Sequence, residues 1–91
     1  MAEIGVVDHP ERNRYEARIG DSVAVLTYRR RPGQITFIHT GVPPAIEHHG
    51  VGSRLAQVAL DAARADGLTV VPNCPFVAEY IREHPEYADL L

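Results

Sequence analysis

The strongest constraint on the fold of this 91-residue chain is a change of hydrophobic period halfway along it. Between residues 14 and 19, apolar and charged side chains alternate at a spacing of two, which predicts a β-strand. Residues 51–66 instead carry apolar side chains at helical spacing, which predicts an amphipathic helix. The first half should therefore form a sheet and the second half should add helices, which makes an α/β chain of the α+β type.

The first half divides into strand-like segments separated by turn residues. Gly20-Asp21 suits a two-residue hairpin turn, and Pro32-Gly33 has the residue order of a type II turn. The strands predicted around these turns and around the polar segment 9–13 are residues 4–7, 14–19, 22–29 and 34–42. Tight turns join the last three of these strands, which indicates a three-stranded antiparallel meander.

The second half begins with a helix over residues 51–66, which Gly67 should stop. Apolar positions at helical spacing define its buried face: Val51, Leu55, Val58, Ala59 and Ala62. Residues 68–71 then read as a short strand. A right-handed crossover would set this strand parallel to the strand at 34–42.

A second helix is predicted from Cys74 or Pro75 to His84, because the residue before a proline disfavours helix. Its apolar stripe is Phe76, Val77, Tyr80 and Ile81. The tail should turn back and bury Tyr87 and Leu90. The predicted architecture is a mixed, mostly antiparallel sheet with two main helices.

Composition bounds the class of protein. Hydrophobic residues are 45% and charged residues 23% of the chain, as in a soluble globular domain. The size predicts one domain over residues 1–91, and no apolar run is long enough to span a membrane. Residues 1–5 lack the basic start of a signal peptide, so we expect a cytoplasmic protein.

The charges exclude several functions. All nine basic residues are arginine, and the net charge is −3. An acidic balance argues against nucleic-acid binding, which needs a basic surface. The lack of lysine excludes a lysine Schiff base or a lysine phosphate clamp. The single cysteine, Cys74, excludes an internal disulfide and a cysteine zinc cluster.

A glycine-rich segment, residues 47–53, lies between the predicted strand at 34–42 and the start of the predicted helix at 51–66. Gly50 and Gly52 would let a ligand approach the backbone, and the helix N-terminus behind them favours a pyrophosphate. A turn without a ligand has the same spacing, so both interpretations stay open.

Cys74 and His39 are candidates for chemistry. Cys74 falls at a predicted helix start, where a thiol is activated, although a buried structural cysteine fits equally. His39 lies near a strand end, where it serves as a general base or as a structural histidine. Strand alternation predicts two faces here, one with Ile35, Phe37 and His39 and the other with Thr36, Ile38 and Thr40.

Three further features have weaker functional interpretations. The adjacent His48 and His49 lack a recognisable metal-ligand spacing, so no metal site is predicted. Tyr80 is expected in the core, with its hydroxyl within reach of the space between the end of the strand at 34–42 and the two helix N-termini. Arg29-Arg30-Arg31 is expected as a solvated turn or, less favoured, as an anion-contacting patch.

Four motifs occur in order along the chain: H-T-x-V-P at 39–43, G-x-G at 50–52, P-x-C-x-F at 72–76 and H-P-E-Y at 84–87. With them, residues 3–91 resemble the small GCN5-related N-acetyltransferase-like (GNAT) family. The resemblance implies a minimal acyl-CoA N-acyltransferase fold, with acetyl-CoA or another acyl-CoA as co-substrate.

The resemblance also implies site residues. In the superfamily, backbone amides of a Q/R-x-x-G-x-G/A segment hold the CoA pyrophosphate. Glu47, Gly50 and Gly52 fall on those positions, and Glu47 departs from the pattern with a carboxylate. The end of the strand at 34–42 is implied to pair with the pantetheine arm. The implied coenzyme A residues are Thr40, Gly41, Val42, His48, His49, Gly50, Val51, Gly52, Ser53, Arg54, Asn73, Phe76 and Tyr80.

Two mechanisms follow from the resemblance, with Cys74 and His39 as the implied catalytic residues. An amine attacks the thioester directly, and His39 or a water takes the proton. Alternatively, Cys74 takes the acetyl group and passes it on. We favour direct transfer.

The predicted function is acetyl-CoA-dependent N-acetyl transfer to an amine on a small molecule or a protein. The alternatives are an acyl-CoA-binding module with little catalysis and a protein-interaction domain with a degenerate CoA site. Only residues 9–13 join the first two strands, where larger family members carry helices. The acceptor half is therefore expected to be open or supplied by a partner, in a monomer or a homodimer.

Overall fold

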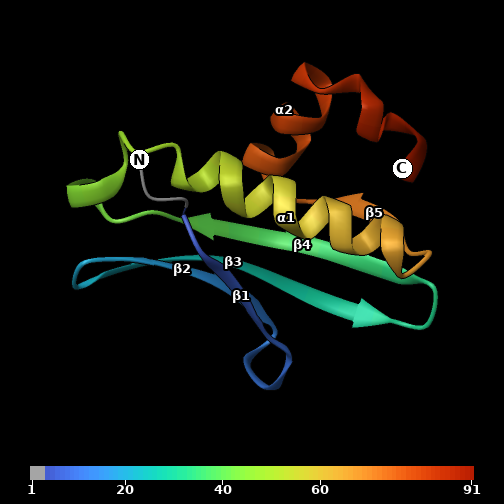
Figure 1. Cartoon of the computed structure of the whole chain (residues 1–91). Helices are drawn as coiled ribbons and strands as arrows, with labels where there is room; N and C mark the ends of the chain where they lie inside the picture. Colours follow the sequence, from blue (N-terminus) through green and yellow to red (C-terminus); the bar gives the residue numbers. More distant parts are fainter. Residues whose placement is uncertain (1–3) are drawn as a thin grey trace.

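A computed structural model describes residues 4–91 of the chain, so residues 1–3 of the predicted domain, including the chain start, lie outside the described residues. Five strands form one sheet in sequence order (Figure 1). The strands are β1 (Val6–His9), β2 (Arg14–Ile19), β3 (Ser22–Arg31), β4 (Gln34–Gly41) and β5 (Thr69–Pro72). The antiparallel pairs β2–β3 and β3–β4 and the parallel pair β4–β5 agree with the sequence prediction, and β1 adds a further antiparallel pair with β2.

Hairpin turns set the register of the antiparallel part. Ile19 pairs with Ser22 across Gly20-Asp21, and Arg31 pairs with Gln34 across Pro32-Gly33. Gly33 has a φ of 76°, which a type II turn requires at that position and which residues with a Cβ rarely adopt. The run Arg29–Arg31 belongs to β3, which corrects the prediction of a turn there. The strand extends because these arginines pair with residues of β4.

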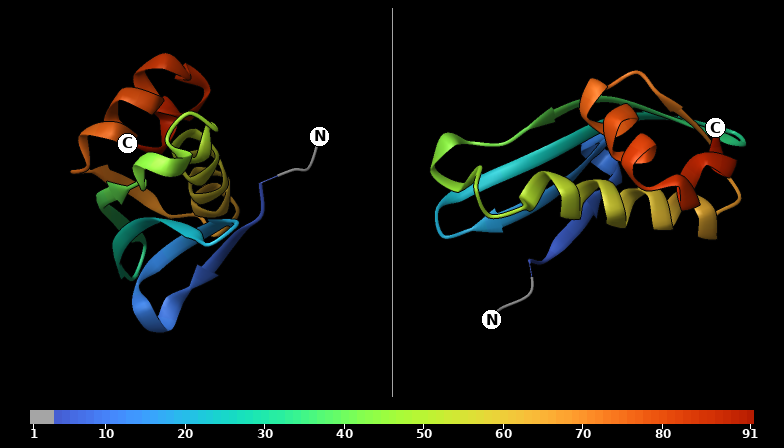
Figure 2. Two further views of the ribbon diagram at one scale, coloured as in Figure 1. Left: turned by 90° about the vertical axis from the view of Figure 1, so that its left-hand side faces the viewer. Right: turned by 90° about the horizontal axis from the view of Figure 1, so that it is seen from above.

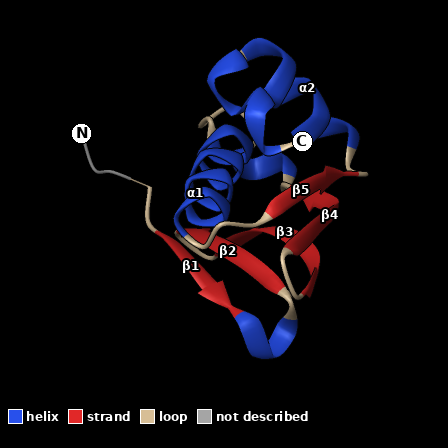
Figure 3. Ribbon diagram, turned by 90° about the vertical axis from the view of Figure 1, so that its right-hand side faces the viewer, coloured by secondary structure: helices blue, strands red, loops and turns tan. Residues whose placement is uncertain are grey.

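Both α-helices cover the same face of the sheet (Figures 1 and 3). They are α1 (Val51–Ala65) and α2 (Pro75–Glu83), each within one or two residues of its predicted end. Short 3₁₀ turns lie at Pro10–Arg12, Pro44–Ile46 and Pro85–Leu90. The last of these buries Tyr87 and Leu90, as expected. No helix of residues 4–91 covers the other face, called here the outer face (Figure 2).

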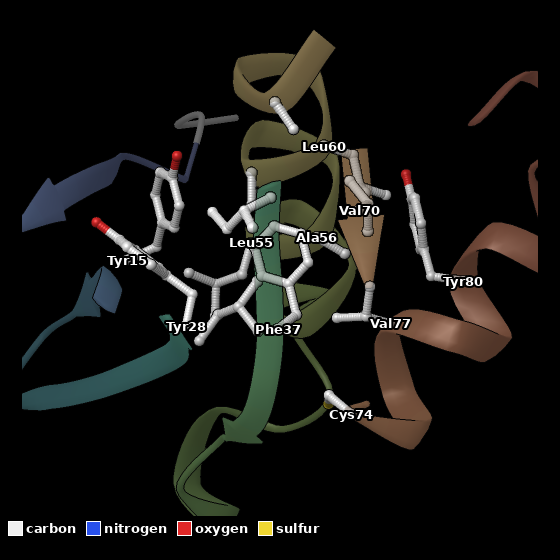
Figure 4. Packing of buried hydrophobic residues seen from close by; sticks show 14 of the residues in the cluster. Tyr15, Tyr28, Phe37, Leu55, Ala56, Leu60, Val70, Cys74, Val77 and Tyr80 are labelled. Atoms are coloured by element: carbon white, nitrogen blue, oxygen red, sulfur yellow. The ribbon is translucent and has the colours of Figure 1, made fainter. Parts of the chain in front are cut away.

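The core lies between the sheet and the two helices (Figure 4). Phe37 of β4 and Leu55 of α1 are fully buried at its centre. The buried face of α1 also includes Ala56, Leu60 and Ala63, whereas the predicted Val58 and Ala62 are only partly buried. The buried face differs from the predicted one because α2 packs beside α1 and covers the side of α1 that carries Ala56, Leu60 and Ala63.

A β-bulge in β4 decides which side chains face the helices. Thr27 pairs with His39 and Tyr28 pairs with Phe37, so Ile38 is an extra residue without a partner on β3. Bulges bend a strand and increase its twist. The parallel pairing with β5 ends at Phe37 and Pro72, immediately before this bulge. The bulge therefore lies where β4 and β5 part.

Within residues 4–91, no helix has the length and apolar character that crossing a membrane requires.

Candidate functional site

A pocket of about 300 Å³ opens where β4 leaves β5 and runs toward the start of α1. Both glycines of the G-x-G segment contribute to it. Its lining residues are Thr40, Val42, Glu47, Gly50, Gly52, Ser53 and Phe76. The volume is at the lower end of what small-molecule sites offer. The structure thus brings the end of β4, the glycine-rich segment and the start of α2 together around one space.

The N-terminus of α1 offers hydrogen-bond donors to this pocket. Gly50 is its N-cap with φ of 70°, and no side chain caps the helix. The backbone N–H of Arg54 bonds to the Gly50 carbonyl and starts the helical ladder. The N–H groups of Val51, Gly52 and Ser53 precede that ladder and have no partner within the helix. With no acidic residue in the first turn, this end suits an anionic ligand.

Gly52 is fitted to its neighbour Phe76. A Cβ built on Gly52 would lie 2.9 Å from Cζ of the Phe76 ring, so the ring occupies the space that a side chain would take. Phe76 is 42% exposed, which corrects its predicted place in the buried stripe of α2. It forms a wall of the pocket instead of packing in the core. A bare backbone at Gly50 and Gly52 beside an aromatic wall lets a ligand approach the main chain closely.

Thr40 and Cys74 meet at the base of this region. The Thr40 hydroxyl lies 3.2 Å from the Cys74 sulfur, within hydrogen-bond distance. Cys74 is the N-cap of α2, and its backbone N–H donates to the Phe37 carbonyl at 2.9 Å. Its side chain is buried, at the sheet end of α2 (Figure 4). The thiol therefore packs against β4 and is not displayed to solvent.

His39 lies on the outer face, which corrects the prediction that it shares a face with Phe37. The bulge at Ile38 adds one residue to the alternation, so His39 is exposed and Thr40 turns toward the helices. His39 Nε2 would lie 3.3 Å from a Cβ built on Gly41, which places both residues on one side of the strand. The structure thus separates His39 and Thr40 onto opposite faces of the sheet.

Glu47 brings a carboxylate to the pocket. It is exposed, lines the pocket, and its Oε1 lies 3.7 Å from Nε2 of His48. The His48 side chain is 90% exposed. A negative charge here opposes an anionic ligand, and a protonated His48 would offset part of that charge.

The remaining predicted residues lie outside this pocket. Val51 is buried in the core, and Arg54 donates a hydrogen bond from Nη1 to Oε1 of Gln57 at 2.9 Å. His49 is exposed in the turn before α1. Tyr80 is buried in the core cluster (Figure 4). Its ring stacks on His84 with centroids 3.9 Å apart. Burial raises its pKa.

Asn73 lies at the outer face, away from the glycine-rich segment. It borders a second depression there with residues of β3 and β4, two of which, Arg29 and Arg31, belong to the run that the sequence interpretation gave, as its less favoured alternative, as an anion-contacting patch. Arg29 and Arg31 on β3, and Gln34, Thr36 and Ile38 on β4, are each spaced by two residues, and this spacing was the sequence signal for a shared face. Among residues 4–91, no three His, Cys, Asp or Glu side chains lie close enough together to hold a metal ion. His48 and His49 therefore belong to no such group in the described part of the chain.

Residues 14–90 match the family model described as GCN5-related N-acetyl-transferase. The chain is also similar in structure to a GCN5-like candidate N-acetyltransferase from Staphylococcus aureus, solved by NMR, with a TM-score of 0.74. That likeness covers 99% of this chain and 89% of the other at 24% identity, and it shows the fold. No curated protein matches the chain. A family match over most of the chain, on this fold, shows that the chain belongs to the GCN5-related N-acetyltransferase family.

Proposed function

We propose that the chain is an acetyl-CoA-dependent N-acetyltransferase that acts on an amine. The observation that carries this proposal is the pocket in which Gly50 and Gly52 leave the start of α1 bare beside Phe76. Membership of the family supports acetyl transfer as the general role.

The chain offers one set of groups to the pyrophosphate of coenzyme A and another to its pantetheine arm. The N–H groups of Val51, Gly52 and Ser53 suit the pyrophosphate. Beyond Phe37, the edge of β4 that faces away from β3 is no longer paired with β5, so its backbone can hydrogen-bond an extended pantetheine arm. Phe76 supplies an apolar wall beside both.

When bound, acetyl-CoA supplies an activated acyl group as a thioester. The amine nitrogen forms a bond to the acyl carbon, the carbon–sulfur bond breaks, and the sulfur of coenzyme A leaves with the electron pair as a thiolate. The nitrogen loses one proton, which His39 on the outer face, or a water beside it, accepts and passes on to the thiolate. Direct transfer is favoured over a Cys74 carrier because the Cys74 side chain is 2% exposed and contacts Thr40.

Binding and turnover test the proposal separately. Acetyl-CoA should raise the melting temperature of the purified protein, since a ligand that binds only the folded state stabilises it. Release of free thiol should then depend on added amine and give an N-acetyl product by mass spectrometry. A rise in melting temperature without amine-dependent thiol release would show that the protein binds acetyl-CoA but does not transfer the acetyl group. If neither the temperature rise nor the thiol release is seen, the proposed coenzyme A site is refuted.

A further inference from the structure

A second depression, of about 340 Å³, lies on the outer face of the sheet over β3, β4 and the end of β5. Six residues line it: Arg29, Arg31, Gln34, Thr36, Ile38 and Asn73. All but Ile38 carry polar or charged side chains. Its volume suits a small polar ligand.

The strand register explains why these side chains gather. Arg29 pairs with Thr36, and Arg31 pairs with Gln34. Their neighbours Tyr28 and Ile35 are buried under the helices, so alternation turns these four side chains to the outer face. The same alternation places Ile38 on this side, beyond the buried Phe37, and the bulge adds His39 next to it.

Arg29 and Arg31 have no ionic or hydrogen-bond partner among residues 4–91. Other arginines of this acidic chain do have carboxylate partners. These pairs are Arg12 and Arg14 with Glu16, Arg30 with Asp66, Arg64 with Asp89, and Arg82 with Glu79. Two adjacent guanidinium groups without a counter-charge, in one depression, make a site for an anion.

The depression adjoins the place where acetyl transfer is proposed. Ile38 of β4 and Asn73, which directly follows β5 and precedes Cys74, border it where the two strands part. The pocket at Gly50 and Gly52 opens beside the same parting. Arg29 pairs with Thr36, and the carbonyl of the next residue, Phe37, accepts a hydrogen bond from the Cys74 N–H at 2.9 Å. The depression and the start of α2 therefore meet within one residue along β4.

We propose that this depression binds the acceptor, and that the acceptor is an amine carrying a phosphate or carboxylate group. The inference rests on the proposed acetyl transfer. Arg29 and Arg31 hold the anionic group, since planar guanidinium groups match both phosphate and carboxylate. Gln34, Thr36 and Asn73 add polar contacts, and Ile38 packs against the carbon chain. The amine end then lies toward His39, on the same face of β4.

Binding without turnover is the first test. Phosphoethanolamine, γ-aminobutyrate and the neutral amines ethanolamine and butylamine are titrated into the full chain with coenzyme A present, and amide shifts are followed by NMR. The anionic amines should shift the amide signals of Thr36, Ile38 and Asn73. They should bind at least about tenfold more tightly than the neutral amines, because a neutral amine has no anionic group to accept charged hydrogen bonds from the two arginines. Comparing phosphoethanolamine with γ-aminobutyrate distinguishes phosphate from carboxylate.

The double variant Arg29→Gln/Arg31→Gln should remove this preference. Arg18→Gln is the matched control, because Arg18 is also exposed on the outer face, has no partner among residues 4–91 and lies outside the depression. With turnover, the double variant should raise KM for anionic amines about tenfold and leave KM for neutral amines and the affinity for acetyl-CoA unchanged. Arg18→Gln should behave as the native chain.

The outcomes separate the two proposals. Equal binding of neutral and anionic amines, or an unaltered KM for anionic amines in the double variant, overturns the acceptor site while acetyl transfer stands. Arginine-dependent binding of anionic amines without any acetylated product supports the site and refutes the proposed activity.

Discussion

The Thr40 hydroxyl oxygen and the Cys74 sulfur lie 3.2 Å apart, and this contact joins β4 to the start of α2 where β4 and β5 part. Both atoms are on the helix side of the sheet, and the Cys74 side chain is 2% exposed. A nucleophilic cysteine needs a thiolate that its substrate can reach. The contact with a neutral hydroxyl in a buried setting favours a packing role for this thiol.

Cys74→Ala is therefore expected to retain acetyl transfer within about tenfold of the native rate, since no covalent step is lost. Steady-state kinetics with any productive amine measures this, and Cys74→Ser controls for the lost sulfur volume. Incubation with acetyl-CoA alone should add no acetyl group to Cys74. Because the sequence has no lysine, an acetyl group on an amine of this chain would be on the N-terminal amine. An acetyl group on Cys74, with activity abolished in both variants, would instead establish the carrier mechanism.

Gly52→Ala is expected to weaken acetyl-CoA binding more than it destabilises the fold. The new Cβ would meet Phe76 at 2.9 Å, so the half-exposed ring, which lines the pocket, must shift and change the shape of the site. Calorimetry should show an affinity loss of about tenfold, worth roughly 1.4 kcal/mol. Gly5→Ala is the control, because a Cβ there meets nothing within 4 Å. Equal affinities for the two variants would refute the ring as a wall of the site.

Glu47→Gln is expected to tighten acetyl-CoA binding. A carboxylate about 6 Å from a phosphate in a water-like medium costs roughly 0.7 kcal/mol, which is about threefold in affinity. The gain should shrink as salt is added, because both charges face solvent. Glu83→Gln, also exposed but on α2 at the end away from the pocket, should bind as the native chain does. Weaker binding by Glu47→Gln would show that the carboxylate contacts the ligand favourably.

All four tyrosines should resist ionisation while the chain is folded. Burial raises the pKa of Tyr15 to about 12 and of Tyr87 to about 12, and burial also raises the pKa values of Tyr28 and Tyr80. Tyr28 additionally donates a hydrogen bond to Asp8 at 2.7 Å, and Tyr87 donates one to Asp61 at 2.7 Å.

The sign of the pH effect follows from these raised values. Unfolded tyrosines lose their protons near pH 10, whereas folded ones keep them, so stability is full below pH 10 and falls as pH rises toward 12. Absorbance at the tyrosinate band should therefore rise together with loss of circular dichroism. Tyrosinate forming near pH 10 in a still folded chain would contradict the burial.

The sequence predicted the order of β2 to β5 and both helices, because these follow from periodicity and turn residues. Gly20, Gly33 and Gly67 lie at turns as their conformational freedom suggests. The faces of β4 past Phe37 were not predictable by alternation, since nothing in the sequence marks Ile38 as a bulge. The exposure of Phe76 was missed for another reason: helical spacing puts it on the stripe, but only the packing of α1 beside α2 shows that Gly52 receives its ring.

The bulge at Ile38 has a consequence for how relatives of different length should be aligned. Two successive residues, Ile38 and His39, face the same side of β4, so the strand holds one residue more than alternation needs. A relative that lacks the counterpart of Ile38 would keep its histidine and threonine on the same sides as here. A gap at this position is therefore compatible with a conserved reaction geometry, whereas a gap elsewhere between Phe37 and Thr40 would delete one of the two groups.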